Sequence, residues 1–451
     1  MENYNKIKNK VIQNNPARLF LFMYIIVIAI GTLLLLLPIS SNSGQWTNLL
    51  DSSFTVVSAT CVTGLVTVVT AAHWSLFGKI VILILIQLGG LGVMTAASIV
   101  SLLFNKKMSI KDRIYLSEEK GMFTIAGIIK LVKFILITTF AIEFIGAVFL
   151  MFTFIPQFGF FKGFWYSIFH AISAFCNAGF DVLGDSSLMP YALNVNISLV
   201  ISLLIIIGGI GHKVIAEFLE KKFKFKEYSL HSKLVLMMTT TLLVLPAIFF
   251  IIVEWNNPET LGQYGFFEKI LTGFFQSTTL RTAGFASTNQ AAYTTSSILL
   301  MLVLMFIGGS PAGTAGGFKT TSFLSLFLVT KANIKQEKEI SLMKRSISSD
   351  LVGKIISLFT VSLAWIFTAV LLITLSDKSL KLIDILFEVF SAYGTVGLTR
   401  GITPFMSNFA KIVIMATMLF GKVGPLSLFI AFTNKANPKT YKLREEEILI
   451  G

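Results

Sequence analysis

Long apolar runs alternate with shorter mixed segments along this chain of 451 residues. A helix needs about 20 mostly apolar residues to cross a bilayer. Runs of that order cover eight ranges: 19–38, 78–104, 131–155, 196–219, 232–253, 297–329, 353–375 and 410–432. Four shorter segments each lie between two of these runs: 49–60, 163–175, 266–279 and 382–392. Because the shorter segments cannot cross a bilayer, the pattern predicts eight transmembrane spans and four re-entrant pore loops.

A similar glycine motif follows each of the four short segments. The motifs are Val62-Thr63-Gly64, Asn177-Ala178-Gly179, Thr282-Ala283-Gly284 and Thr395-Val396-Gly397. A hydroxyl residue stands six positions before each glycine, at Ser58, Ser173, Thr278 and Ser391. Columns at fixed offsets mark an internal repeat. We therefore predict an all-α polytopic membrane protein in which four consecutive units of helix, pore helix, filter loop and helix surround a pseudo-fourfold pore.

The repeat divides the chain into six parts. They are a cytoplasmic N-terminal segment at 1–18, repeat 1 at 19–104, repeat 2 at 105–219, repeat 3 with a broken second helix at 220–330, repeat 4 at 331–432 and a cytoplasmic tail at 433–451.

The composition supports a location in the cell (plasma) membrane. Hydrophobic residues make up 54% of the chain and charged residues 13%, against about 25% charged in soluble domains. The net charge is +14, and most Lys and Arg lie in the termini and in the loops that join the repeats. Since such loops are cytoplasmic, both termini are predicted to be cytoplasmic. The basic charge then reflects topology, and no nucleic-acid partner is expected.

The glycine motifs predict a cation filter. Glycine permits a positive φ and leaves no side chain in the lumen, so backbone carbonyls can replace the hydration shell of a cation. Each preceding half-helix would direct its partially negative C-terminal end toward the same centre. Close helix packing is the alternative explanation for glycines in a membrane. The filter is favoured because four matched copies occur.

A second glycine column lies in the helix after each filter motif. The groups Gly89-Gly90-Leu91-Gly92 and Gly208-Gly209-Ile210-Gly211 are explained by packing alone. In repeat 3 the run 308–319 cannot remain a regular helix, because it combines proline with several glycines. A broken helix at membrane depth often lines the transport path, and a static kink is the alternative. The predicted gate residues in this run are Gly308, Gly309, Gly313, Gly316, Gly317 and Lys319.

Three charged residues stand at membrane depth. Lys422 lies in the last span, where lysine costs on the order of 2.5–3.5 kcal/mol, and we predict that it faces the pore as a positive barrier; snorkelling or an acidic partner is the alternative. Arg281 precedes the third filter glycine, where it either orients the filter or acts as a structural clamp. The partner of Glu143 cannot be named from sequence. His212-Lys213 is interpreted as the cytoplasmic end of a span.

With these residues, the chain resembles the potassium-translocating membrane subunit of the Trk/Ktr/HKT superfamily, specifically the Ktr type. The resemblance rests on the four filter glycines, on the segment from Arg281 to Phe285 and on the interrupted helix after Gly308, and it extends from Arg18 to Lys435. It implies potassium uptake, often stimulated by sodium, by a homodimer in which each chain contains a pore. It also implies a cytosolic ring of regulatory subunits that bind ATP or ADP and control the broken helix.

The resemblance also implies which ions and cofactors take part. Potassium is the substrate and binds only at the filter, sodium is a possible activator, nucleotide binds the partner subunit, and no covalent cofactor is expected. In plant relatives a serine in place of the first filter glycine accompanies sodium preference, whereas this chain has Gly64 there. The family usually has arginine where this chain has Lys422, so the charge is kept.

Two alternative functions stay open. The same fold could transport mainly sodium, and a secondary transporter could use broken helices to bind an anionic solute. A membrane enzyme would need clustered polar residues, but the four histidines are scattered without a ligand spacing such as HExxH. The sequence therefore predicts that the protein is not an enzyme. These histidines are His73, His170, His212 and His231.

Overall fold

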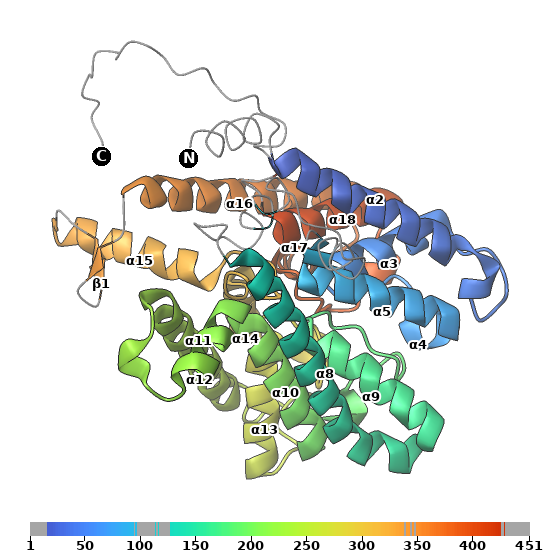
Figure 1. Cartoon of the computed structure of the whole chain (residues 1–451). Coiled ribbons are helices and arrows are strands. Elements are labelled where there is room, and N and C mark those ends of the chain that lie inside the picture. Colours follow the sequence, from blue (N-terminus) through green and yellow to red (C-terminus); the bar gives the residue numbers. More distant parts are fainter. Residues whose placement is uncertain are drawn as a thin grey trace.

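The computed structural model describes residues 16–93, 95–96, 113, 116, 127–337, 340–342, 345–346, 349–424 and 428. The described chain is almost entirely helical (Figure 1), apart from a short antiparallel ladder between β1 (Ser341–Leu342) and β2 (Arg345–Ser346). The prediction of a helical membrane protein is therefore confirmed. The predicted cytoplasmic tail and most of the predicted N-terminal segment lie outside the described residues.

Within each predicted repeat the helices follow the same order. The first helices are α2 (Pro16–Leu36), α8 (Ile128–Phe158), α12 (Leu230–Val253) and α16 (Ser349–Ser376). The pore helices are α3 (Leu49–Cys61), α9 (Phe160–Phe175), α13 (Phe266–Thr279) and α17 (Leu382–Gly394). The second helices are α5 (Leu76–Leu91), α10 (Val195–Ile210) with α11 (His212–Lys221), α14 (Thr295–Phe306) with α15 (Thr320–Ile334), and α18 (Asn408–Val423). The short helix α4 (Thr70–His73) precedes α5.

The repeats close into a circle. In Figure 1 the first repeat, in blue, lies beside the last, in red, and α3 packs against α18. The green and yellow helices of repeats 2 and 3 complete the arrangement, with α10 packed against α13. The pore helices occupy the buried centre, while α8, α12 and α16 carry many exposed apolar side chains, such as Phe152 and Phe367. Such an apolar surface is expected where lipid, and not water, surrounds the protein.

The second helix of each repeat begins at a side chain that caps the first turn. Ser75, Asn194, Thr294 and Ser407 each accept a hydrogen bond from the backbone N–H of the third residue of the helix that follows. Such caps satisfy donors that the helix itself leaves free. The four second helices therefore begin at comparable places in their repeats.

The predicted second spans are not continuous helices. In the described residues three helices, α8, α12 and α16, are long and apolar enough to cross a membrane alone, and the pair α10 and α11 gives a fourth if it is counted as one bent span. The helices α3, α5 and α14 are apolar but shorter. The runs 78–104, 196–219 and 410–432 are thus wrong as uninterrupted helices.

A glycine ends the second helix in three of the repeats. Gly92, Gly211 and Gly424 have φ of 90°, 92° and 90° and ψ of 134°, 140° and 128°. The carbonyl of each glycine accepts a hydrogen bond from the N–H four residues later, at Ala96, Ile215 and Leu428. An L side chain rarely adopts this φ. The expectation that only repeat 3 has a broken second helix is therefore wrong, and packing alone does not explain Gly92 and Gly211 of repeats 1 and 2.

Packing does explain the first glycine of the same column. A Cβ atom built on Gly89, Gly208 or Gly421 would lie 2.1, 1.9 or 1.9 Å from a carbonyl oxygen near the end of the pore helix in its own repeat. No side chain fits at these distances. The second helices therefore pack directly on the pore-helix ends, and this close contact positions the filter segments.

Candidate ion pathway

The four filter glycines form a closed ring. A Cβ atom built on each glycine would meet a carbonyl oxygen of the next repeat, and repeat 4 meets repeat 1. The distances are 2.5 Å from Gly64 to Ala178, 2.7 Å from Gly179 to Ala283, 2.4 Å from Gly284 to Val396 and 2.0 Å from Gly397 to Thr63. No side chain can be accommodated at any of the four positions without movement of the backbone. The structure thus brings together the four motifs that the sequence analysis selected.

All four motifs share one backbone conformation. The first residue of each has a positive φ although it is not glycine, and the glycine two positions later has a positive φ as well. The values are 57° at Val62, 59° at Asn177, 62° at Thr282 and 50° at Thr395, and between 68° and 97° at the four glycines. The middle residue of each motif is not among the positive-φ residues, so the sign of φ alternates along all four motifs. The four segments thus have the same irregular, non-helical backbone.

Hydroxyl side chains of the pore helices hold this conformation. Ser58 Oγ accepts from the Gly64 N–H at 3.0 Å, and Ser391 Oγ accepts from the Gly397 N–H at 3.0 Å. In repeat 2, Ser173 Oγ instead donates to the Phe180 carbonyl at 2.7 Å. These bonds offset the strain of the left-handed residues, on the order of 1–3 kcal/mol each.

Repeat 3 departs from the predicted hydroxyl column. Thr279 Oγ1 donates to the Phe285 carbonyl at 2.7 Å, as Ser173 does in repeat 2. Thr278, which the fixed offset selects, donates at 2.9 Å to the carbonyl of Phe274 in its own helix. In repeat 3, Thr279 and not Thr278 therefore makes the hydrogen bond that holds the filter segment.

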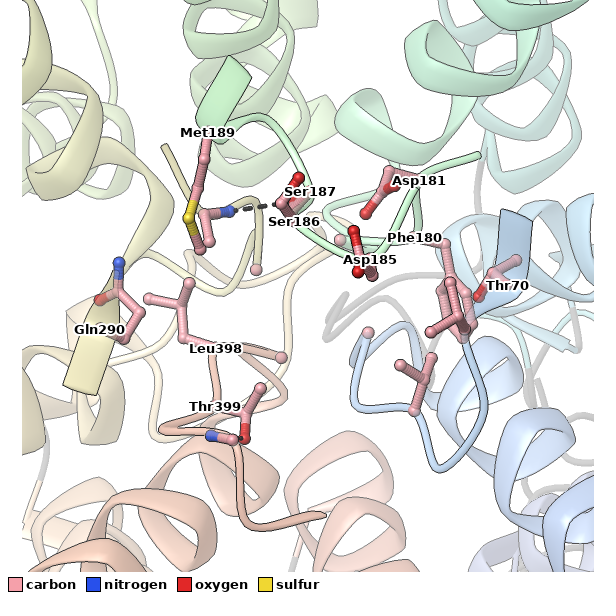
Figure 2. A pocket seen from close by; sticks show the side chains of 18 of the residues that line it. Thr70, Phe180, Asp181, Asp185, Ser186, Ser187, Met189, Gln290, Leu398 and Thr399 are labelled. Atoms are coloured by element: carbon pink, nitrogen blue, oxygen red, sulfur yellow. Dashed lines mark hydrogen bonds between the residues drawn. The ribbon is translucent and has the colours of Figure 1, made fainter. Parts of the chain in front are cut away.

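A cavity of about 260 Å³ opens at the glycine end of the filter motifs. Its lining includes the four filter glycines together with Asp181, Asp185 and Arg400. Figure 2 shows the two aspartates close to each other on one wall, with Leu398 and Thr399 on another. We call this cavity the outer cavity, and the ring of four glycines forms part of its wall.

The charges around the outer cavity are unequal. Arg400 Nε lies 2.6 Å from Asp384 Oδ1, and its Nη1 donates to the Gln290 carbonyl at 3.0 Å. Asp181 accepts from the Leu183 N–H at 3.2 Å, and burial raises its pKa to about 6. The charge of Arg400 is thus offset by Asp384, and the carboxyl groups of Asp181 and Asp185 stand in the cavity lining without such an ion pair among the described residues.

The opposite end of the filter motifs is covered by the gate loop, residues 307–319 between α14 and α15. The loop bonds to second helices of two other repeats: the Ser310 N–H donates to the Gly209 carbonyl at 3.0 Å and the Gly317 N–H to the Gly421 carbonyl at 3.1 Å. The Gly316 N–H donates to Thr395 Oγ1 at 3.1 Å. The loop of repeat 3 therefore extends from repeat 2 to repeat 4 beneath the filter.

The predicted gate glycines lie where the loop is crowded. A Cβ atom on Gly316 would lie 2.4 Å from Thr395 Oγ1, and one on Gly308 would lie 1.9 Å from the Gly316 carbonyl. Gly309 and Gly313 lie close to the carbonyl of Gly209. Gly317 has a φ of 71°. Lys319 Nζ donates to the Ala315 carbonyl at 2.6 Å and so closes the loop on itself.

Thr314 of the gate loop contacts both the second filter segment and Lys422. Its hydroxyl lies 3.2 Å from both the Phe175 carbonyl and Asn177 Oδ1 of the second filter segment. Its own carbonyl accepts from Lys422 Nζ at 2.6 Å. The predicted barrier lysine therefore extends from α18 to the gate loop, where it bonds to a backbone carbonyl.

The comparisons with known proteins decide the family. The model of the TrkH family, described as cation transport protein, matches residues 20–441. The chain belongs to this family. Membership identifies a transport protein and not an enzyme, as the sequence predicted, and the Ktr-type resemblance is confirmed by the relatives.

Members of the TrkH family resemble this chain over nearly its whole length. The potassium/sodium uptake protein NtpJ of Enterococcus hirae is 40% identical, with 97% of each chain covered. The Ktr system potassium uptake protein B of Bacillus subtilis is 37% identical and covers 98% of this chain and 99% of its own. The crystal structure of TrkH from Vibrio parahaemolyticus has the same fold, with a TM-score of 0.74 at 18% identity over 92% of this chain and 84% of that one.

Glu143 has a partner that the sequence did not reveal. Gln87 Nε2 of α5 donates to Glu143 Oε1 at 3.0 Å, and Cys176 Sγ lies 3.9 Å from the same oxygen. Both cysteines, Cys61 and Cys176, are buried and free. The group joins α8, α5 and the second pore-helix end, behind the filter of this TrkH-family chain.

Arg281 is buried behind the third filter segment. Its Nη2 donates to Thr239 Oγ1 of α12 at 3.3 Å, and its carbonyl accepts from Asn177 Nδ2 at 3.1 Å. The Arg281 side chain therefore bonds to a first helix, while its backbone carbonyl bonds to the second filter segment.

Sequence reasoning missed the residues of the outer cavity. Asp181 follows Gly179 by two positions, but an acidic residue in a loop of a membrane protein is ordinary. Its position became informative only when the four glycines and Asp185 were found to line one cavity.

Proposed function

We propose that this chain takes up potassium ions across the cell membrane through a channel-like pore. The observation that carries this proposal is the closed ring of four glycines, with matched backbone conformation, between an outer cavity and a gate loop. Both relatives described above are named for potassium uptake and match nearly the full chain, which supports the same substrate here.

Selection takes place at the ring. Potassium loses its water at the carbonyls of the twelve filter residues, and glycine at all four key positions leaves the lumen free of side chains. The pore-helix ends contribute partial negative charge toward the same centre. Anions are repelled by the same groups. The filter is the place where potassium binds along the path.

Passage is controlled below the ring. The gate loop crosses from repeat 2 to repeat 4, and Lys422 holds its Thr314 carbonyl. Conduction requires that the loop move aside, and the lysine charge opposes a cation at this depth. The loop and the lysine together form the gate.

The assembly that we propose is a homodimer with one pore in each chain. A cytosolic ring of nucleotide-binding subunits acts on the gate loop, and sodium stimulates transport. Similarity to Ktr system proteins over almost the entire chain supports this arrangement. Native mass measurement of the protein in detergent, alone and with a candidate ring subunit, tests it.

Growth of a bacterial strain that lacks its own potassium uptake tests the function. We expect the chain, expressed with a matching regulatory subunit, to restore growth at low potassium, while empty vector does not. The amount of protein in the membrane is measured in parallel. Absence of growth despite normal membrane levels contradicts the proposal.

Sodium is the second candidate substrate. The name of the Enterococcus hirae relative includes both ions, and the same ring of carbonyls could select sodium. Uptake of labelled sodium in the same cells, with unlabelled potassium as competitor, separates the two. Potassium is expected to suppress sodium entry; sodium uptake that is insensitive to potassium favours the second candidate.

A further inference from the structure

The bend between α10 and α11 lies directly against the gate loop. The two helices meet at an angle of 97°, and Gly211 between them has a φ of 92°. A Cβ atom on Gly211 would lie 2.5 Å from the Pro311 carbonyl. The bend between α10 and α11 therefore contacts the middle of the gate loop.

His212, the first residue of α11, bonds to the loop twice. Its backbone N–H donates to the Ala312 carbonyl at 3.2 Å, and its ring Nδ1 lies 3.0 Å from the same oxygen. A carbonyl oxygen only accepts, so Nδ1 carries the proton. In the neutral ring Nε2 then accepts from the Thr139 hydroxyl of α8, at 3.3 Å. The side chain is 2% exposed, which fixes its orientation.

Ala312 is in a conformation that needs such support. Its φ is 59°, in the left-handed region that residues with a side chain seldom occupy. Strain of this kind persists only where surrounding contacts impose it. The two bonds from His212 are contacts of this kind at Ala312.

The far part of α11 is fixed to the start of α12. Glu217 accepts from the Ser229 N–H and from Ser229 Oγ, each at 2.8 Å, and Lys221 Nζ lies 2.7 Å from Glu217 Oε1. A displacement of the connection between repeats 2 and 3 would therefore move α11 as one piece. Its other end is His212, in contact with the gate loop.

We propose that His212 is a positioning residue of the gate: its two hydrogen bonds to Ala312 hold the gate loop in its closed position and couple the loop to movement of α11. This rests on the proposed function, because the loop is a gate only if the ring conducts potassium. His212 touches no ion; it acts through the loop.

Two substitutions of similar polarity separate the hydrogen bond from mere packing. His212→Asn keeps a donor near the position of Nδ1, whereas His212→Gln places its amide near Nε2 and loses that donor. The matched control is His73, whose Nε2 lies 3.1 Å from Thr47 Oγ1 on the side of the outer cavity. His73→Gln alters the same chemistry away from the gate.

The measurement is potassium flux into liposomes that contain the full-length protein without a partner, followed with a potassium-sensitive dye. We expect His212→Gln and His212→Ala to raise the maximal flux about two- to tenfold, as loss of one buried hydrogen bond implies. The potassium concentration at half-maximal flux and the potassium-to-sodium ratio stay unchanged. His212→Asn and His73→Gln behave like wild type.

Three results would overturn the inference: equal flux in the Gln variant and wild type, equal gains in the Asn and Gln variants, or a changed ion ratio. If His212→Ala is unstable, Thr139→Val replaces it in the test. We expect this variant to raise the maximal flux by a smaller factor, and an unchanged flux would count against the inference. If wild type carries no potassium at all, the proposed function fails instead. The two failures are thereby distinguishable.

Discussion

At the residue scale, the filter glycines are constrained twice, by their own φ and by the backbone of the next repeat. Gly64 has a φ of 97° and lies against Ala178, while Gly44 has a φ of 67° with nothing within 4 Å of its Cβ position. The two positions share the conformational demand, but only one has a neighbour. Substitutions at Gly64 and at Gly44 therefore separate the effect of backbone strain from the effect of steric crowding.

We expect Gly64→Ser to reduce the preference for potassium over sodium, because the side chain must displace the Ala178 carbonyl from the ring. Gly44→Ser is the control, with a similar φ and open space. Competition between labelled potassium and sodium in whole cells measures the ratio. An unchanged ratio in a well-expressed Gly64→Ser protein would argue against a filter at this position.

Lys422 supplies both a charge and a hydrogen bond to the gate loop. Lys422→Ala removes a charge-assisted bond of about 1.5–3 kcal/mol, so we expect maximal flux to increase about tenfold or more. Lys422→Arg keeps the charge and stays near wild type, and Lys411→Ala at the other end of α18 is the control. Flux in liposomes measures the effect. Equal flux in the Ala variant and wild type would assign the lysine to stability alone.

At the element scale, the sequence predicted the helices better than their interruptions. The apolar runs and the glycine motifs located the pore helices to within a few residues. The length of each apolar segment and its fixed distance from a glycine motif can both be read from the sequence. The breaks at Gly92 and Gly424 were missed, since glycine in an apolar run indicates close packing as readily as a positive φ. The partner of Glu143 was also missed, because Gln87 lies in another repeat and only folding brings the two together.

The start of α18 depends on an acid from the loop that follows α16. Asp377 accepts from the Ser407 N–H at 2.8 Å and from Ser407 Oγ at 2.7 Å. Burial raises the pKa of Asp377, but hydrogen bonds from Ser376 and Ser407 outweigh it and the net pKa is lowered. A group whose pKa is lowered by folding stabilises the fold at pH values above its ordinary pKa, which is 3.8 for Asp377. This contribution is lost as the pH falls through the lowered pKa.

Asp377→Asn is therefore expected to lower the thermal unfolding temperature at pH 7 and to have a diminishing effect as the pH falls below 4. Thermal unfolding in detergent at a series of pH values provides the measurement. Glu259→Gln, at an exposed loop position, is the control and should have little effect. A destabilisation that is equal at all pH values would show that the carboxylate charge is not responsible.

At the scale of the whole molecule, the proposed function makes the charges around the outer cavity relevant to how ions reach the ring. Asp185 is exposed at the outer cavity, and a unit charge about 8 Å from an ion in water contributes about 0.5 kcal/mol. The position of this cavity could not be predicted, because it forms from loops of all four repeats. The circular order of the repeats, in contrast, followed directly from the spacing of their motifs.

Asp185→Asn is expected to reduce flux about twofold at low potassium and low ionic strength, with the difference vanishing at high salt because the charge is screened. Glu259→Gln again serves as the control, since it does not line the cavity. Initial rates at two salt concentrations measure this. A reduction that persists unchanged at high salt would indicate a structural effect.

The closed ring of contacts between successive glycines has a consequence for how such a pore evolves. In a tetramer of identical subunits every mutation alters all four walls at once. Here one gene encodes four walls, so a single mutation alters one quarter of the circumference and leaves three quarters intact. Selectivity can therefore be adjusted in small heritable steps. One wall is also free to specialise: Asn177 bonds to the gate loop through Thr314, and the other three motifs carry no asparagine.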